Sequence, residues 1–90
     1  MDTGVRQMHK AKVYVKLRES ILDPEGSAVQ GSLQKLGFSE VKNVRIGKMI
    51  ELEVDRTQGK GIESRIEEMC RMLLVNEVIE DFYYETEDLS

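Results

Sequence analysis

The sequence predicts an α+β domain of the ferredoxin-like βαββαβ type, with a four-stranded antiparallel sheet and two helices on one face. Three observations predict it. Residues 10–18 alternate strictly between apolar and polar side chains, as a half-buried strand does. Two stretches with apolar residues at helical spacing begin near residues 24 and 62. Strand-like segments occupy 41–55 and 78–86, which completes the order of six elements.

The length of 90 residues is that of a single domain. We expect a flexible N-terminal leader at 1–9, a domain over 10–87 and a C-terminal tail at 88–90. No apolar stretch is long enough to span a bilayer, and the polar N-terminus does not have the form of a signal peptide. The single cysteine, Cys70, cannot form an internal disulfide and favours a reducing, cytoplasmic setting.

The first strand and the first helix have clear local signals. Every second residue of 11–17 is apolar, and the residues between them are Lys or Tyr. The helix begins after Asp23, which can cap its free amides, with Pro24 at the first helical position and Glu25 complementing the helix dipole. Gly37 is placed to end this helix in a left-handed conformation. The apolar residues expected to pack on the sheet are Val29, Leu33 and Leu36.

Residues 41–55 are predicted to form a β-hairpin. Val44 and Ile46 on the first arm match the alternating apolar residues of the second. Gly47-Lys48 supplies a two-residue turn, in which Gly accepts a positive φ. This hairpin would give the sheet its fourth strand. The residues expected to point outward from its second arm are Met49, Glu51, Glu53 and Asp55.

A second amphipathic helix and a last strand complete the prediction. The apolar face of the helix consists of Ile62, Ile66, Met69 and Leu73. In the last strand we place Val78, Phe82 and Tyr84 inward, and Ile79, Asp81, Tyr83 and Glu85 on the opposite face. Right-handed crossovers put the first strand in the centre of the sheet and both helices on one face. The other face is left open, with Tyr14, Met49 and Tyr83 on it.

The net charge of −4 is unevenly distributed along the chain. Lys and Arg outnumber Asp and Glu by nine to five in residues 1–48, whereas twelve acids oppose four bases in residues 49–90. An acidic chain with no basic stripe is poorly suited to nucleic acids. We expect the two halves to interleave on the open face, where each cross-strand pair of opposite charges contributes about 0.2–1 kcal/mol. Basic residues of the central strand, Lys12, Lys16 and Arg18, would then lie between Glu51, Glu53 and Asp55 on one side and Asp81 and Glu85 on the other.

No reactive cluster is recognisable in the sequence. The one histidine, His9, falls in the leader, and Cys70 is expected to be a buried structural thiol. Glu67-Glu68 point in different directions on a helix, and Gly59-Lys60-Gly61 lacks the spacing and the hydroxyl of a P-loop. We therefore predict no catalytic, cofactor-binding or metal-ligating residue in this chain.

Three motifs stand out in the sequence: LDPEG at 22–26, VRIGK at 44–48 and NEVIEDF at 76–82. Taken together they resemble the PurS family, the small subunit of phosphoribosylformylglycinamidine (FGAM) synthase. The resemblance implies a role in de novo purine biosynthesis. It implies a complex that uses ATP and glutamine-derived ammonia to convert formylglycinamide ribonucleotide to its amidine.

The same resemblance implies a division of labour. The large synthetase subunit, PurL, would use ATP and Mg, and the glutaminase subunit, PurQ, would release ammonia. This chain would carry no catalytic residue and no cofactor. It would self-associate as a dimer or tetramer and join the other two subunits, supporting ammonia transfer. Neither nucleic acid nor a membrane is an expected partner.

The residues expected at partner interfaces are Arg45, Gly47 and Lys48, followed by Asp23, Glu25, Asn76 and Glu80. The first three would form a basic hairpin tip. The alternative function is an ACT-like regulatory module that binds a small molecule. Such modules commonly have a glycine after the first strand, and this chain has none between that strand and Gly26, which favours the assembly subunit. An independent enzyme is a third and more distant reading.

Overall fold

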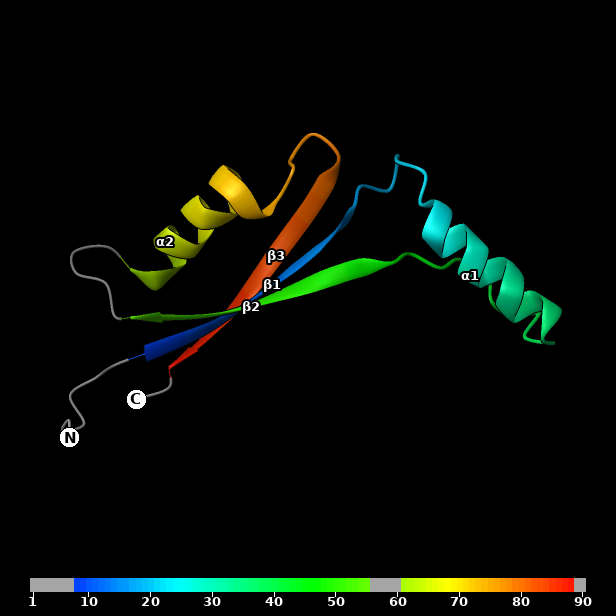
Figure 1. Ribbon diagram of the computed structural model, residues 1–90, viewed down its shortest axis with the longest axis horizontal. Coiled ribbons are helices and arrows are strands. Elements are labelled where there is room, and N and C mark those ends of the chain that lie inside the picture. Colours follow the sequence, from blue (N-terminus) through cyan, green and yellow to red (C-terminus); the bar gives the residue numbers. More distant parts are fainter. Residues whose placement is uncertain (1–7, 56–60, 89–90) are drawn as a thin grey trace.

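The computed structural model describes residues 8–55 and 61–88, which are organised around a three-stranded antiparallel sheet (Figure 1). β1 (Met8–Leu17) lies in the middle, between β2 (Gly47–Asp55) and β3 (Glu80–Asp88). The α+β class and the central position of the first strand are therefore confirmed. Because β1 begins at Met8, the lone histidine lies in the sheet rather than in a leader.

The two helices lie in different places relative to the sheet (Figure 1). α2 (Ile62–Met69) covers one face and continues into a π-helical turn, η1 (Cys70–Leu74). Residues 18–46 form an arm that projects from one end of the sheet and contains α1 (Pro24–Lys35). α1 does not pack against the strands. The prediction that both helices cover one face is therefore wrong. The molecule is elongated, with extents of 56 × 29 × 15 Å.

The core lies between α2–η1 and the face of the sheet that they cover. The central strand of the sheet, β1, contributes Ala11, Val13 and Val15, all buried as the alternation in its sequence predicts. The helical segment contributes Ile66 and Cys70, both fully buried. Phe82 and Tyr84 also face this core, as predicted. The thiol of Cys70 is thus a structural one, and burial raises its pKa.

The predicted hairpin turn at Gly47-Lys48 is wrong. β2 begins at Gly47, which pairs with Lys16, and residues 41–46 continue straight into the arm without pairing to any described strand (Figure 1). The strands approach so closely that a Cβ on Gly47 would lie 2.7 Å from the carbonyl oxygen of Val15. Glycine is therefore required here for strand pairing. Within the described residues of one chain, the sheet has three strands and the four-stranded ferredoxin-like arrangement is not present.

The π-helical turn changes which side chains face the core. In η1 the amide of Val75 donates to the carbonyl oxygen of Cys70, five residues earlier (2.9 Å), so this turn holds one residue more than an α-helical turn. Leu74 consequently packs against the core, and Leu73 is 83% exposed. The inward position predicted for Leu73 is wrong. Val78, also predicted inward, is exposed in the turn before β3.

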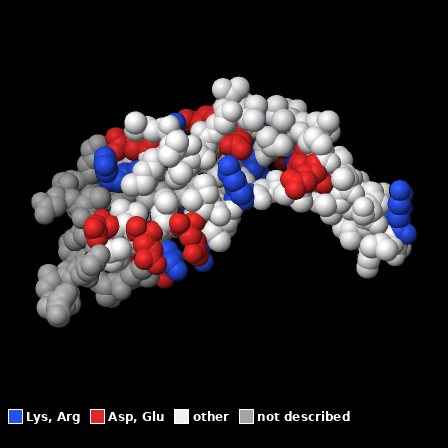
Figure 2. Space-filling view, viewed as in Figure 1, with Lys and Arg blue, Asp and Glu red and all other residues white. Residues whose placement is uncertain are grey.

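The open face of the sheet carries the charge-compensated rows that the sequence predicts. The central strand places Lys10 between Glu53 and Glu87, Lys12 between Glu51 and Glu85, and Lys16 beside Asp81. Figure 2 shows acidic and basic side chains close together over the sheet and α2, and acidic side chains again where the arm begins; the stretch of the arm between these and the basic side chain at its far end is uncharged in this view. The excess of acids in the second half of the chain is thus distributed along strands that flank a basic one.

Replacing Ile66 with Ala should lower the free energy of unfolding by about 2–5 kcal/mol, because the fully buried side chain would leave a cavity. The matched change Leu73→Ala, on the same helical segment but exposed, should cost less than about 0.5 kcal/mol. Urea unfolding followed by circular dichroism measures both values. Similar losses at the two positions would contradict the register set by the π-helical turn.

Candidate interaction surface

The seven residues predicted at partner interfaces gather at the end of the sheet from which the arm leaves. Four of them line a shallow hollow of about 180 Å³: Glu25, Gly47, Lys48 and Glu80. The other three, Asp23, Arg45 and Asn76, form hydrogen bonds with the backbone around it. The structure therefore brings together residues that lie far apart in the sequence.

Asp23 connects the start of α1 to the chain that returns from the arm. It is 4% exposed, and its carboxylate accepts hydrogen bonds from the amides of Gly26 (2.9 Å) and Ile46 (2.7 Å). The first bond is the predicted helix cap. These two amides, with a smaller contribution from the Arg45 guanidinium, hold the pKa of Asp23 below its usual value despite its burial.

Arg45 makes a second connection across the base of the arm. Its Nη2 donates to the carbonyl oxygens of Arg18 (2.7 Å) and Ile21 (2.8 Å) and lies 3.5 Å from that of Leu17. The position predicted for Arg45, at a hairpin tip, is wrong because that hairpin does not form. Its guanidinium is directed at the backbone of the turn that follows β1, where it satisfies carbonyl groups that no strand pairs.

The start of α1 packs very closely against the returning chain. A Cβ on Gly26 would lie 2.1 Å from the carbonyl oxygen of Val44 and 2.9 Å from Oδ2 of Asp23. Capping explains the LDPEG motif only in part, because a glycine in the first turn of a helix otherwise weakens it. That unfavourable glycine was the signal in the sequence for this close approach.

The remaining candidates differ in how far they are engaged within the chain. Asn76 and Glu80 close the turn before β3. The backbone amide of Asn76 donates to the Glu80 carboxylate (2.8 Å), and the side-chain oxygen of Asn76 accepts from the backbone amide of Val78 (3.2 Å). The side chains of Glu25 and Lys48 are exposed and, in the part of the chain that the structure describes, make no hydrogen bond or ion pair. Those two side chains are available to a partner.

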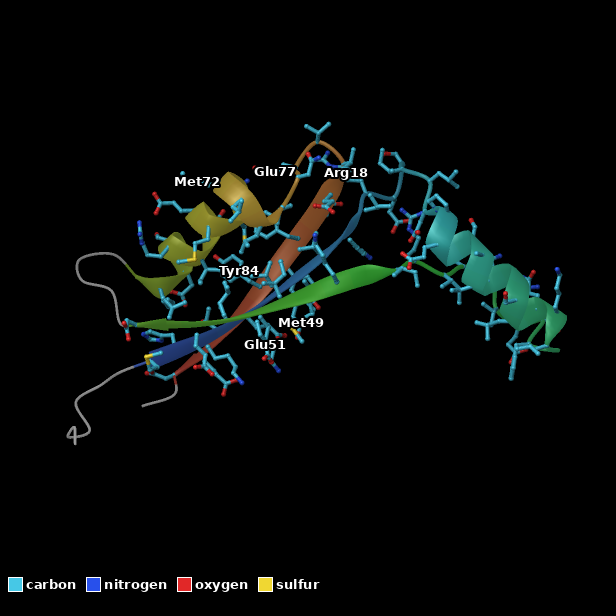
Figure 3. All side chains as sticks on the ribbon, in the orientation of Figure 1. Arg18, Met49, Glu51, Met72, Glu77 and Tyr84 are labelled. Carbon is cyan, nitrogen blue, oxygen red and sulfur yellow. The ribbon has the colours of Figure 1, made fainter. Side chains whose placement is uncertain are left out.

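A larger hollow, of about 460 Å³, lies beside Gly47 at the same end of the sheet. Tyr14 and Tyr83 stack along it, with ring centroids 4.7 Å apart, and Figure 3 shows Met49 on the side of the sheet opposite α2. The prediction that these three side chains lie on the open face is confirmed. Burial and the neighbouring Glu85 carboxylate, to which the Tyr14 hydroxyl donates, raise the pKa of Tyr14.

Sequence reasoning missed a network around Arg71, which lies on the exposed side of η1. Its guanidinium donates to Glu67 (2.8 Å) and to Glu77, and it lies 5.5 Å from the centroid of the Phe82 ring. Bonds from Arg71 and from the Tyr84 hydroxyl lower the pKa of Glu67. The i, i+4 spacing of Glu67 and Arg71 was the available signal. These charges satisfy one another, so the network does not present a reactive group.

The described residues contain no group of three or more His, Cys, Asp or Glu side chains placed to bind a metal ion. Within the same residues, no helix has the length and apolar character needed to cross a membrane. The polar, Gly-rich sequence of Thr57–Gly61 predicts a loop between β2 and α2; this stretch lies outside the described residues except for Gly61, which precedes α2.

Comparison with known proteins identifies relatives that match this chain along nearly all of its length. The family model PurS, described as phosphoribosylformylglycinamidine (FGAM) synthase, matches residues 10–88. The phosphoribosylformylglycinamidine synthase subunit PurS of Bacillus subtilis is 49% identical over 82 residues, which cover 91% of this chain and 96% of that protein. A solved structure of B. subtilis PurS has a TM-score of 0.80 and covers 88% of this chain and 98% of its own.

Two further solved structures describe the setting of such relatives. Methanocaldococcus jannaschii PurS is described as one of the subunits of formylglycinamide ribonucleotide amidotransferase in the purine biosynthetic pathway. It is 39% identical, has a TM-score of 0.79 and covers 91% of this chain and 99% of its own. A chain in the structure of PurLQS from Thermotoga maritima is 32% identical, has a TM-score of 0.75 and covers 91% of this chain and 98% of its own.

Replacing Gly26 with Ala should destabilise the base of the arm, because the new methyl group would collide with the Val44 carbonyl. Gly31→Ala is the matched control within α1. Apart from the neighbouring residues and backbone of α1 itself, no atom lies within 4 Å of its added Cβ, so this change should stabilise the helix by about 0.5–1 kcal/mol. Thermal unfolding followed at 222 nm measures both effects. If the melting temperature shifted in the same direction in both variants, the result would contradict the close approach at Gly26.

Asp23 should contribute stability that is lost in acid. Its pKa in the folded chain is below its usual value of 3.8, so the contribution is complete above that value and disappears as the pH falls through the depressed one. The stability difference between the wild type and Asp23→Asn should therefore shrink between about pH 5 and about pH 2. Ser20→Ala removes no titratable group, so its stability difference from the wild type should stay constant over the same pH range. Denaturant unfolding at each pH provides the measurement, and a constant difference for Asp23→Asn would contradict it.

Proposed function

The chain belongs to the PurS family of FGAM synthase subunits, and on that basis we propose that it joins the synthetase subunit PurL to the glutaminase subunit PurQ without catalytic residues of its own. The observation that carries the proposal is the match over nearly the whole length of both chains. It includes 96% of the B. subtilis subunit and 98% of the chain in the PurLQS structure.

The reaction served would be the ATP- and glutamine-dependent conversion of formylglycinamide ribonucleotide to its amidine in purine biosynthesis. In this proposal PurL holds ATP and Mg, PurQ releases ammonia, and this chain supports ammonia transfer by holding the two subunits together. It binds no cofactor itself and works in the cytoplasm. The available side chains of Glu25 and Lys48, beside the base of the arm, support a role in contacts with other subunits.

We also propose that the chain self-associates as a dimer or tetramer, and that two copies complete the ferredoxin-like arrangement between them. Val44 and Ile46 are spaced as the apolar residues of a strand, but residues 41–46 pair with no described strand. α1 and the residues after it leave Leu36 and Phe38 exposed, at 74% and 48%. Because the chain runs straight through Gly47 instead of turning back, α1 and residues 41–46 are displaced from the sheet together. Such a displacement is typical of domain swapping, in which identical chains exchange an element.

Mixing the chain with PurL and PurQ from the same organism should give one larger species, measured by size-exclusion chromatography with light scattering in the presence of ADP and glutamine. Lys48→Gln should weaken this complex at least about threefold, because it removes an available cation from the hollow at the base of the arm. Lys10→Gln, on the charge-compensated open face, is the control and should change the affinity less than twofold. If no larger species forms with either ligand, the proposal fails.

A further inference from the structure

We propose that Asp23 and Arg45 form a joint that fixes the direction in which the arm leaves the sheet, and that this direction positions α1 for assembly. Asp23 caps α1 with one carboxylate oxygen and holds the returning chain with the other. The part that concerns assembly rests on the proposed function.

Two segments meet at the base of the arm: the outgoing chain, residues 18–23, and the returning chain, residues 41–46. Asp23 and Arg45 connect these segments in opposite directions. Asp23, on the outgoing chain, accepts a hydrogen bond from the amide of Ile46 on the returning chain (2.7 Å). Arg45, on the returning chain, donates to the carbonyl oxygens of Arg18 and Ile21 on the outgoing chain. Neither segment can slide or rotate past the other without breaking at least one of these bonds. One further side-chain bond joins the two sides of the arm: Nε2 of Gln34, near the far end of α1, donates to the carbonyl oxygen of Val41 (2.7 Å), away from the joint.

A carboxylate is needed at position 23 because both of its oxygens accept. One oxygen serves the amide of Gly26 and the other serves the amide of Ile46. An Asn side chain has only one accepting oxygen, and a Ser hydroxyl is too short to bridge the two amides. Since Asp23 is buried, losing the second bond leaves the Ile46 amide without a partner, which is unfavourable.

The arm amplifies any movement at this joint. α1 has 12 residues and is therefore about 18 Å long, so a rotation of about 20° at its base moves its far end by about 6 Å. α1 does not pack against the strands, so the sheet does not hold its direction. A displacement of this size is comparable to the width of a side chain, and it would take Leu36 out of register with a binding surface.

The variant Asp23→Ser separates the joint from the helix cap. Serine caps helices well, so the bond to Gly26 is kept, while the bond to Ile46 is lost. We expect unchanged helical content by circular dichroism, at least tenfold faster hydrogen exchange of the Ile46 amide, and an at least tenfold higher dissociation constant for the complex with PurL and PurQ. Ser20→Ala is the control: it lies on the outgoing chain, its side chain makes no hydrogen bond among the described residues, and it should change neither value more than twofold.

Each result decides a separate point. Unchanged exchange at Ile46 in Asp23→Ser would overturn the joint, and faster exchange with an unchanged dissociation constant would overturn its role in assembly. If the wild-type chain forms no complex, the proposed function fails, while exchange at Ile46 still shows whether the joint exists. Should Asp23→Ser not fold, Arg45→Met leaves the cap of α1 intact and removes the donor to the carbonyls of Arg18 and Ile21. It should raise the dissociation constant at least tenfold, and an unchanged constant would overturn the role of the joint in assembly.

Discussion

The arm exists because Gly47 pairs with Lys16 as the first residue of β2. Strand pairing at this point forces the preceding chain to run straight, so residues 41–46 cannot fold back beside β2. α1, which lies on the far side of that segment, is carried away from the sheet with it (Figure 1). The absence of a side chain on Gly47 permits the close approach to Val15 that this pairing needs. The elongated shape and the uncovered helix both follow from this one contact.

The parts of the fold that local chemistry determines could be predicted from the sequence. Alternation identified β1, and the residues at both ends of α1 identified its cap and its stop, where Gly37 has the expected positive φ of 105°. The hairpin was mispredicted because a glycine suits both a tight turn and a close strand pair. The apolar pattern of 41–46 identifies a strand, but it does not specify which strand it pairs with. Leu73 was misplaced because a period of 3.6 residues does not anticipate a π-helical turn.

The candidate surface was predictable as a set of residues but not in its roles. The sequence shows that Arg45 and Lys48 are cations close to each other, yet only the fold shows that one is directed at backbone carbonyls and the other at solvent. The arm also differs in character from the sheet. Its residues 26–34 contain no Asp, Glu, Lys or Arg in a chain that is 33% charged. When another protein covers this segment, no charged side chain has to be desolvated, so the free-energy cost of burial is small. The open face of the sheet, in contrast, carries charges that already compensate one another.

The sheet and the arm differ in their aromatic side chains and therefore in their near-ultraviolet signals. The chain has no tryptophan, and its three tyrosines, at positions 14, 83 and 84, all belong to β1 and β3. Near-ultraviolet absorption and emission therefore originate almost entirely from the sheet, with two of the three rings stacked on its open face. The arm, whose only aromatic residue is Phe38, is nearly silent at those wavelengths. A tryptophan placed on the arm would thus report on that region alone, against an unchanged signal from the sheet.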